Sequence, residues 1–342
     1  MIPLHRPAIQ RKDLEAVLES LVNDQLGFGS LSHKFSQIFE KHLFGDSARV
    51  FRDRLTAAHF LWEVWGLQPG DGIVMAPFGS ALLAYSAIQR GLSVYFADVL
   101  ANLPVLDPQS VASIVRANPS IKVIIADHPY GLIPDVKTLQ KLGLKVLEDV
   151  RWGYGGVADM ELVGSRGHAA LISLEDDGIL CAGGGEVLVV RGKDSAQELK
   201  KVLQRVTDQV FLSDLNAALG LAQFEQKNIQ IAKRREFLER WVHAFRRDSG
   251  HLFLQSTEYD PVMSHLVFQV PINASEVIAY ARKKGVKMAL AFQDSASSFQ
   301  PQALEHLPHA SALLGRSLLY PLYPALSANE QKTLLSVLSS LP

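Results

Sequence analysis

Carboxylates are the side chains of this sequence best placed to do chemistry. Asp149 follows directly on segment 145–148, which has the apolar character of a buried strand. Glu175, Asp176 and Asp177 form an acidic run further along the chain. Ligands of open α/β sheets bind at the carboxyl ends of the strands, where such groups can act as acid and base or hold a metal. The alternative for Asp149 is structural, as a cap for the following turn.

The other candidate sites have less support in the sequence. Cys181 is the single cysteine, which excludes an internal disulfide and a zinc site built from cysteines. His306 and His309 have a spacing found in metal sites, but Pro308 interrupts the helix that would orient both rings. Three consecutive glycines at 183–185 lead into a strand rather than a helix, which favours a turn over a phosphate loop. We therefore predict no metal site.

Composition excludes several classes of protein. Lysine and arginine total 34 against 35 aspartate and glutamate, a formal charge of −1, and the spacing of the basic residues predicts no clustered basic face for a nucleic acid. No apolar run approaches the ~18 residues that a membrane helix needs, and the first residues, Met1–Pro7, lack the apolar core of a signal peptide. We expect a cytoplasmic protein that binds neither nucleic acid nor membrane.

The elements that must position these side chains alternate along the first half of the chain. Short apolar segments predict buried parallel strands, and amphipathic segments between them predict helices. Asp107 followed by Pro108 is a good helix start. The expected strands are 72–76, 93–97, 122–126 and 145–147, and the expected helices are 12–22, 31–43, 80–90, 107–117 and 135–142. This order indicates a mostly parallel sheet with helices on both faces.

The second half of the chain changes character. Segments 169–174 and 186–190 predict a hairpin-like pair of strands, and 213–247 predicts one long helix. Shorter elements follow, with strands at 266–270 and 318–319 and helices at 275–284 and 328–341. We therefore expect a large α/β domain over residues 1–245 and a smaller α+β domain over 246–342.

Several short motifs, in this order, resemble one family, the DegT/DnrJ/StrS group of nucleotide-sugar aminotransferases. The motifs are Ile2-Pro3-Leu4 with Arg6-Pro7, the segment 66–71, His128-Pro129-Tyr130-Gly131, Glu148-Asp149 and the segment 212–220. The resemblance covers nearly the whole chain. It implies a fold-type-I fold like that of transferases that use pyridoxal phosphate (PLP), together with a homodimer whose two subunits close the cleft.

The resemblance also assigns site positions, two of which keep the family's residue. Asp149 corresponds to the carboxylate that keeps the pyridine nitrogen of PLP protonated, and Ser173 corresponds to a serine on the next strand. Five residues after that serine the family has the lysine that forms the Schiff base, and here the position is Gly178. The sequence has no lysine between Lys145 and Lys193, so a shift of a few residues does not restore this amine.

The remaining cofactor positions that the resemblance assigns have changed. Asp53 and Arg54 stand in the turn that holds the phosphate, which puts a carboxylate where an anion would bind. Ala81 replaces the aromatic residue that covers the ring, and Trp152 replaces a smaller glutamine. Gln209 stands where a neighbouring subunit would supply an asparagine.

These changes lead us to expect no catalytic residue and no bound cofactor. The function that we expect is a non-catalytic homologue of sugar aminotransferases, either a subunit that binds a nucleotide-sugar or a structural or regulatory subunit, in a polysaccharide or secondary-metabolite pathway. Two alternatives stay open: an active PLP enzyme whose lysine comes from elsewhere, and an acid/base or metal-assisted enzyme that reuses Asp149, Glu148 and residues 175–177. We expect a homodimer with interface surface near Trp62 and segment 212–222.

Overall fold

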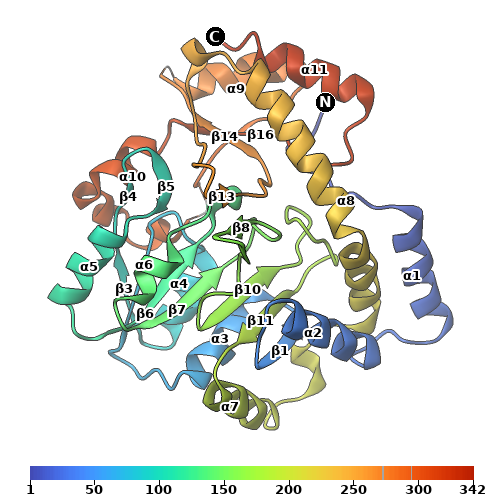
Figure 1. Cartoon of the computed structure of the whole chain (residues 1–342), viewed down its shortest axis with the longest axis vertical. Helices are drawn as coiled ribbons and strands as arrows, with labels where there is room; N and C mark the ends of the chain where they lie inside the picture. Colours follow the sequence, from blue (N-terminus) through green and yellow to red (C-terminus); the bar gives the residue numbers. More distant parts are fainter. Residues whose placement is uncertain (272, 294) are drawn as a thin grey trace.

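Seven strands form the central sheet of the computed structural model, which describes residues 1–271, 273–293 and 295–342 (Figure 1). Their order is β1-β11-β10-β7-β6-β2-β3. The strands are β1 (Ser47–Phe51), β2 (Gly72–Met75), β3 (Ser93–Phe96), β6 (Ile121–Asp127), β7 (Lys145–Asp149), β10 (Ala169–Ser173) and β11 (Glu186–Val190). All neighbouring pairs are parallel except the two that involve β11. The predicted α/β fold and the antiparallel pairing of 169–174 with 186–190 are confirmed.

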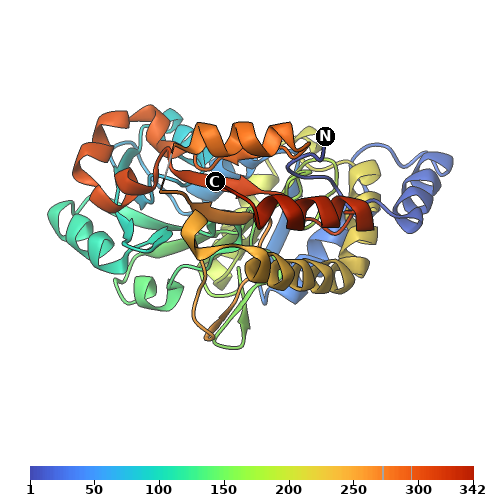
Figure 2. The ribbon, with the colours of Figure 1, turned by 90° about the horizontal axis from the view of Figure 1, so that it is seen from above.

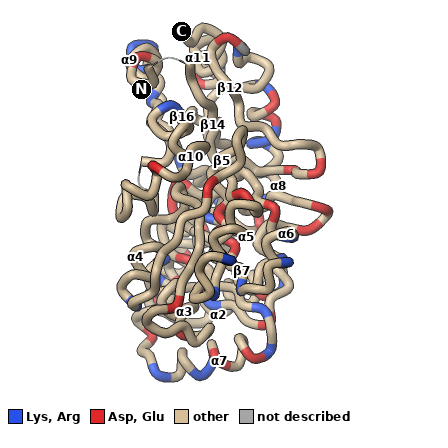
Figure 3. Tube along the Cα trace, turned by 90° about the vertical axis from the view of Figure 1, so that its left-hand side faces the viewer, with Lys and Arg blue, Asp and Glu red and all other residues tan. Residues whose placement is uncertain are grey.

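Helices cover both faces of this sheet. In Figure 3, α3 and α4 lie on one side of the trace, and α5 and α6 lie on the other. The helices of this part of the chain are α1 (Arg11–Val22), α2 (Ser30–His42), α3 (Arg54–Val64), α4 (Ala81–Gln89), α5 (Pro108–Ala117), α6 (Val136–Gln140), α7 (Lys193–Leu203) and α8 (Asp214–Ala244). Helix α6 is shorter than predicted, and the sequence analysis did not identify β1 or α7.

A smaller antiparallel sheet packs beyond α8, in the order β12-β14-β16-β15. Its strands are β12 (His251–Leu252), β14 (Leu266–Gln269), β15 (Ala289–Leu290) and β16 (Ser317–Tyr320). The helices of this part of the chain are α9 (Ala274–Lys283), α10 (Pro308–Leu313) and α11 (Ala328–Leu338). There are two further small sheets among the described residues. One pairs β13 (Tyr259–Asp260) with β8 (Val157–Ala158) and β9 (Glu161–Leu162), and the other pairs β4 (Val99–Leu100) with β5 (Leu103–Leu106). Helix α8 ends one residue before the domain boundary that we predicted, and the division into two domains stays a prediction.

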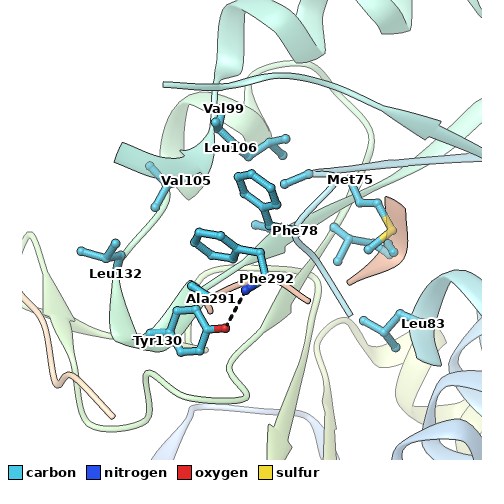
Figure 4. Packing of buried hydrophobic residues seen from close by; sticks show 14 of the residues in the cluster. Met75, Phe78, Leu83, Val99, Val105, Leu106, Tyr130, Leu132, Ala291 and Phe292 are labelled. Atoms are coloured by element: carbon cyan, nitrogen blue, oxygen red, sulfur yellow. Dashed lines mark hydrogen bonds between the residues drawn. The ribbon is translucent and has the colours of Figure 1, made fainter. Parts of the chain in front are cut away.

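Aromatic contacts join the elements of the large sheet to those of the smaller one (Figure 4). The rings of Phe78 and Phe292 stack with centroids 4.1 Å apart. The backbone N–H of Phe292 donates to the Tyr130 hydroxyl over 3.2 Å. All three side chains are buried. The loop after β15 is therefore held against the end of β6, next to the carboxyl edge of the large sheet.

Helix α1 turns its polar side inward. It projects at one end of the molecule in both Figure 1 and Figure 2. Asp13 is fully buried and accepts hydrogen bonds from the side-chain amides of Gln223 (2.7 Å) and Gln226 (2.9 Å) on α8. In contrast, Leu14 and Leu18 are 63% and 61% exposed. The apolar stripe that identified this helix in the sequence therefore faces outward from this chain.

The residues near which the sequence analysis expected interface surface are buried inside the protein. Trp62 is fully buried, and its indole N–H donates to the Ser86 hydroxyl over 2.9 Å. In segment 212–222, Leu212, Ala217 and Leu221 are buried as well. These side chains therefore belong to the core, and an interface formed by the surface near them stays a prediction.

Candidate functional site

Four polar side chains meet at the carboxyl edge of the large sheet. Asp127 ends β6 and pairs in register with Asp149, which ends β7. Ser173 ends β10 and pairs with Glu186 at the start of β11. Their side chains are all nearly inaccessible to solvent. Because β11 runs antiparallel, its first residue arrives at the edge where the parallel strands end, and this reversal is the reason that the sequence analysis missed Glu186.

Arg54 fills the centre of this cluster. It is the first residue of α3, whose N-cap is Asp53, with the Asp53 carboxylate accepting from the Thr56 N–H over 2.8 Å. The guanidinium donates through Nη1 to Asp149 Oδ1 over 2.6 Å and through Nη2 to Glu186 Oε1 over 2.9 Å. Only 6% of the Arg54 surface is exposed. The buried guanidinium of Arg54 thus donates a hydrogen bond to each of the two carboxyl groups. A buried charge needs partners of this kind to offset its loss of hydration.

The buried charges shift the pKa values of the cluster. Burial lowers the pKa of Arg54, but the negative charges of Asp149 and Glu186 outweigh that effect and raise it, so the guanidinium stays protonated. Burial raises the pKa of Glu186 to about 8, against the opposing influence of Arg54. Glu186 is therefore mostly protonated at neutral pH. The positive charge of Arg54 then balances the negative charge of Asp149 alone.

Asp127 is a second buried acid in the same place. Burial, and then the charge of Asp149, raise the pKa of Asp127 well above its usual value. Neither of its carboxyl oxygens makes a hydrogen bond of good geometry within the described residues, although the backbone N–H groups of Ser80 and Ala76 are close enough to stabilise its charge. The cluster therefore places two acids with raised pKa values, Asp127 and Glu186, beside one guanidinium.

Trp152 closes the front of the cluster. Its ring stacks on Tyr130 with centroids 4.5 Å apart, and the guanidinium of Arg151 lies 4.3 Å from the centroid on the indole. The indole N–H donates to Asp177 Oδ2 over 3.0 Å, and Arg151 Nη2 contacts the same oxygen at 3.2 Å. These contacts of Asp177 hold the acidic loop, residues 175–177, against Trp152.

The space left behind Trp152 is very small. The cavity has a volume of about 20 Å³, which is enough for one water molecule. Its walls include the end of β6, the turn before α4 and Asp149; the lining residues are Phe78, Gly79, Ser80, Asp127, His128, Pro129, Asp149, Arg151 and Trp152. No lysine is among these described residues.

Gly178 lies in a turn of the loop after β10. Its N–H donates to Glu175 O over 3.1 Å, and Arg234 Nη2 lies 3.5 Å from its carbonyl oxygen. A side chain at this position would begin 3.1 Å from Glu175 O and 3.2 Å from Leu180 O, which is tight but not forbidden. The loop conformation therefore does not demand a glycine.

The other predicted site positions are dispersed. Asp149 and Trp152 line the small cavity, and Ser173 accepts a hydrogen bond from the N–H of Glu175 over 3.3 Å. Asp53, Ala81 and Gln209 are not among the residues that line the cavity, and Asp53 and Gln209 are exposed. The cofactor-binding roles that the resemblance assigned to these positions stay predictions.

The carboxylates of the acid/base alternative do not converge. Asp176 Oδ2 lies 3.7 Å from His5 Nε2 at the surface, whereas Asp177 faces Arg151. Glu148 accepts three backbone N–H groups, the closest from Gly167 at 2.6 Å, and lies 3.4 Å from His128. Among the described residues, no group of three or more histidine, cysteine, aspartate or glutamate side chains is arranged to hold a metal ion.

A larger cleft lies outside Trp152. It has a volume of about 220 Å³ and shares Phe78, Arg151 and Trp152 with the small cavity. Polar groups from distant parts of the sequence line it: His5, Asp177, His265, Gln293 and Ser295. Burial, and then the charge of Arg234, lower the pKa of His265 to about 3, so this histidine is neutral. Hydrogen-bonding groups above aromatic walls suit a polar small molecule.

Comparison with known proteins extends over the whole chain. One curated relative, the dTDP-4-dehydro-2,3,6-trideoxy-D-glucose 4-aminotransferase of Saccharopolyspora spinosa, is 24% identical over 97% of this chain and 94% of its own. A putative sugar aminotransferase of Streptococcus pneumoniae, in its PLP form, superposes with a TM-score of 0.90 at 14% identity, covering 99% of this chain and 98% of that one.

A second solved structure is that of a GDP-4-keto-6-deoxymannose-3-dehydratase mutant with bound GDP-perosamine. It has a TM-score of 0.87 at 16% identity and covers 99% of this chain and 100% of that chain.

Among the described residues, none of the helices has the length and apolar character of a membrane span. The sequence profile of one family matches residues 7–339. The chain belongs to the DegT/DnrJ/EryC1/StrS aminotransferase family.

Proposed function

We propose that this family member does not bind PLP covalently and acts as a non-catalytic subunit that binds a nucleotide-sugar. The observation that carries the proposal is the 2.6 Å ion pair between Arg54 and Asp149. In the family, the carboxylate at this position serves the pyridine nitrogen of the cofactor. Here a guanidinium of the same chain already satisfies it, and breaking a buried ion pair is strongly unfavourable.

Two further features count against PLP. A cavity of about 20 Å³ admits one water molecule and not a substituted pyridine ring. Gly178 supplies no amine, and no lysine is among the described residues that line the cavity or the cleft outside it. These residues do not fit the cofactor, so we derive no catalytic step through it. The same observations argue against the alternative of an active enzyme with a lysine from elsewhere in this chain.

The cleft outside Trp152 is the proposed place for the nucleotide-sugar. It offers hydrogen-bond donors and acceptors on His5, Arg151, Gln293 and Ser295, and its volume of about 220 Å³ suits a sugar ring. A structurally similar dehydratase holds GDP-perosamine. The acid/base alternative is less well supported, because Asp149 is engaged by Arg54 and residues 175–177 point to different partners.

We further propose that the protein is a homodimer. The support is the outward apolar stripe of α1, where Leu14, Leu18 and Leu21 are 63%, 61% and 47% exposed. A row of leucines three and four residues apart is the usual packing face of a helix, and a two-fold axis can bury the same surface on both copies.

The test of the catalytic proposal is incubation of the purified protein with PLP, followed by borohydride reduction and mass spectrometry of the intact chain. We expect no stoichiometric adduct and no visible absorbance band of a lysine-bound cofactor. Scattered substoichiometric labelling of exposed lysines would agree with the proposal, since peptide mapping would then find no single modified residue. One adduct per chain at one mapped lysine would overturn it.

The test of the ligand uses calorimetric titration with dTDP-glucose, a nucleotide-sugar of the kind named for the Saccharopolyspora relative. We expect one site per chain and roughly tenfold weaker binding in Arg151→Ala, since a charge-assisted contact is lost. The exposed Arg282→Ala is the matched control and should leave binding unchanged. Absence of binding, or equal binding in Arg151→Ala, would refute this part of the proposal.

A further inference from the structure

A groove lined by cations runs along the edge of the large sheet opposite the carboxyl cluster. Four adjacent strands, β6, β7, β10 and β11, each bring one basic residue to this edge: Lys122, Lys145, His168 and Arg191. Two hollows of about 570 and 300 Å³ share Lys145 and His168 and so form one continuous groove. The sequence analysis, which looked for a basic face for a nucleic acid, did not identify this groove.

The sequence analysis did not identify the basic residues of this groove because they are far apart in the sequence. Successive residues of the four are separated by 23 positions at each step. The parallel strands β6, β7 and β10 begin at this edge, and the antiparallel β11 ends there. The strand order therefore brings these four residues side by side, although the connections between them differ. Lys193, at the start of α7, adds a further cation to the same groove.

The positive charges of the groove lack carboxylate partners. Within the described residues, no acid lies within ion-pairing distance of Lys122, Lys145 or Lys193. Arg191 donates only to backbone carbonyls, those of Gly167 (2.7 Å), Leu43 (2.8 Å) and Gly164, and its Nε has no partner. The three lysines therefore present positive charges without an ion-pair partner, whereas Arg191 lies within the influence of Glu148 and Asp46.

Two acids and one further arginine also line the groove. Asp71 and Asp194 are the acids, one at each end. Arg166 is neutralised locally, since its Nε contacts Glu161 at 2.6 Å and its Nη2 contacts Asp159 at 3.1 Å. Lys122, Lys145 and Lys193 thus share the groove with two lining carboxylates, while the charges of Glu148 and Asp46 act on Arg191.

His168 contributes a neutral hydrogen-bond donor at the middle of the groove. The backbone N–H of Val146 donates to His168 Nδ1 over 3.0 Å, which assigns the ring proton to Nε2. Burial, and then the nearby charges of Lys145 and Arg191, lower the pKa of this histidine. The imidazole therefore offers an N–H to a ligand without adding to the electrostatic repulsion among the cations.

Trp65 forms part of the wall at the Lys122 end of the groove. Its ring is partly exposed and packs beside Trp62 with centroids 6.3 Å apart. Its indole nitrogen has no hydrogen-bond partner among the described residues. An aromatic surface beside lysines is a combination that accommodates a planar group attached to phosphates.

We propose that this groove binds a small anion with two or more phosphate groups. The four strands span three strand spacings, about 14 Å, which exceeds the size of one phosphate. Lysine ammonium groups bind phosphate as point charges, and the His168 N–H lies between them. The site is separate from the cleft outside Trp152 and does not depend on the function proposed for that cleft.

Calorimetric titration of the full-length protein with sodium tripolyphosphate, at low salt, tests the proposal. We expect saturable binding that weakens as sodium chloride is added, because screening shortens the range of the groove's field. Lys122→Gln with Lys145→Gln should raise the dissociation constant roughly tenfold. The exposed pair Lys283→Gln with Lys332→Gln carries the same change of charge on α9 and α11 and should leave the dissociation constant within about twofold.

Two further variants locate the anion and identify its source. Arg151→Ala should bind tripolyphosphate as the unchanged protein does, and loss of binding in this variant would place the anion in the cleft and overturn the proposal. Equal loss in both lysine pairs, or no binding at all, would also overturn it. Trp65→Leu distinguishes the source: weaker binding of UTP with unchanged tripolyphosphate indicates a nucleotide, and no change for either indicates a free polyphosphate.

Discussion

Arg54 donates to Asp149 over 2.6 Å with both side chains almost completely buried. The two residues are far apart in the sequence and meet because the first turn of α3 faces the end of β7. The same guanidinium reaches Glu186 over 2.9 Å. The positive charge that stabilises this buried carboxylate is thus supplied by the polypeptide itself.

Replacement of Arg54 by methionine should strongly destabilise the protein. The change keeps an unbranched apolar stem, shorter than that of arginine, but leaves Asp149, Glu186 and Asp127 buried without a cation. Removal of one partner from a buried ion pair costs about 3–5 kcal/mol. The free energy of unfolding in urea measures the effect, provided that the transition is two-state.

Two companion variants show whether the lost ion pair is the cause. Arg52→Met removes an exposed arginine two residues earlier and should cost under about 1 kcal/mol. Adding Asp149→Asn to Arg54→Met should restore part of the stability, since the uncompensated charge is removed. Equal losses in Arg54→Met and Arg52→Met would contradict the described geometry.

The ionisation of Glu186 should make the free energy of unfolding depend on pH. Its pKa is about 8 in the folded protein and 4.5 is its ordinary value, so folding favours the protonated form. The stability that this group contributes is therefore complete below pH 4.5 and is lost as the pH rises through 8. Glu186→Gln keeps an acceptor for Arg54 and cannot ionise.

The comparison between the two proteins isolates that one group. Unfolding free energies at several pH values should show the native protein losing a few kcal/mol relative to Glu186→Gln between pH 5 and 8, and no further change above that range. Other shifted groups, such as His265, cancel in the difference because both proteins share them. Parallel curves for the two proteins would mean that Glu186 is already ionised near pH 5.

Asp177 should hold Trp152 in place. Its carboxylate accepts from the Trp152 indole over 3.0 Å and contacts Arg151 at 3.2 Å. In Asp177→Ala we expect a loss of about 1–2 kcal/mol and greater quenching of tryptophan fluorescence by acrylamide. Repeating the quenching with Trp152→Phe identifies the ring that becomes accessible. The neighbouring Asp176→Ala, which is exposed, should change neither quantity.

A charge placed on the apolar face of α1 should separate the proposed dimer. Leu18→Glu puts a carboxylate at the middle of the stripe, where the side chain is 61% exposed in the single chain. Light scattering should report a dimer for the native protein and a monomer for the variant, with folded far-ultraviolet spectra for both. Met160→Glu, at a position 97% exposed outside the stripe, is the control and should stay dimeric. A native protein that is monomeric at micromolar concentration would refute the dimer.

Much of the fold was accessible from the sequence because its strands are continuous apolar runs and its helices have clear starts. Asp107 caps α5 through a hydrogen bond to the Gln109 N–H over 2.9 Å, and Ser327 forms the capping box of α11 with Glu330. Signals of this kind act between residues a few positions apart. They fix where an element begins, whatever the rest of the chain does.

The site was accessible only in part. Asp149 and Trp152 could be assigned because short motifs keep their spacing from one protein to another. The partner of Asp149 could not, since Arg54 was assigned to a phosphate turn, and Glu186 and Asp127 carried no motif. Their roles depend on the register between neighbouring strands, which aligns Asp127 with Asp149 and Ser173 with Glu186.

The sequence alone thus determined the order of strands and helices, the family resemblance and the glycine at position 178, because these are properties of neighbouring residues. Only the tertiary structure decided that Arg54 neutralises Asp149, that the leucines of α1 face outward, and that three cations and one histidine spaced by 23 residues line one groove. Each of these depends on which strands become neighbours, and that choice is made by the burial of apolar surface over the whole domain.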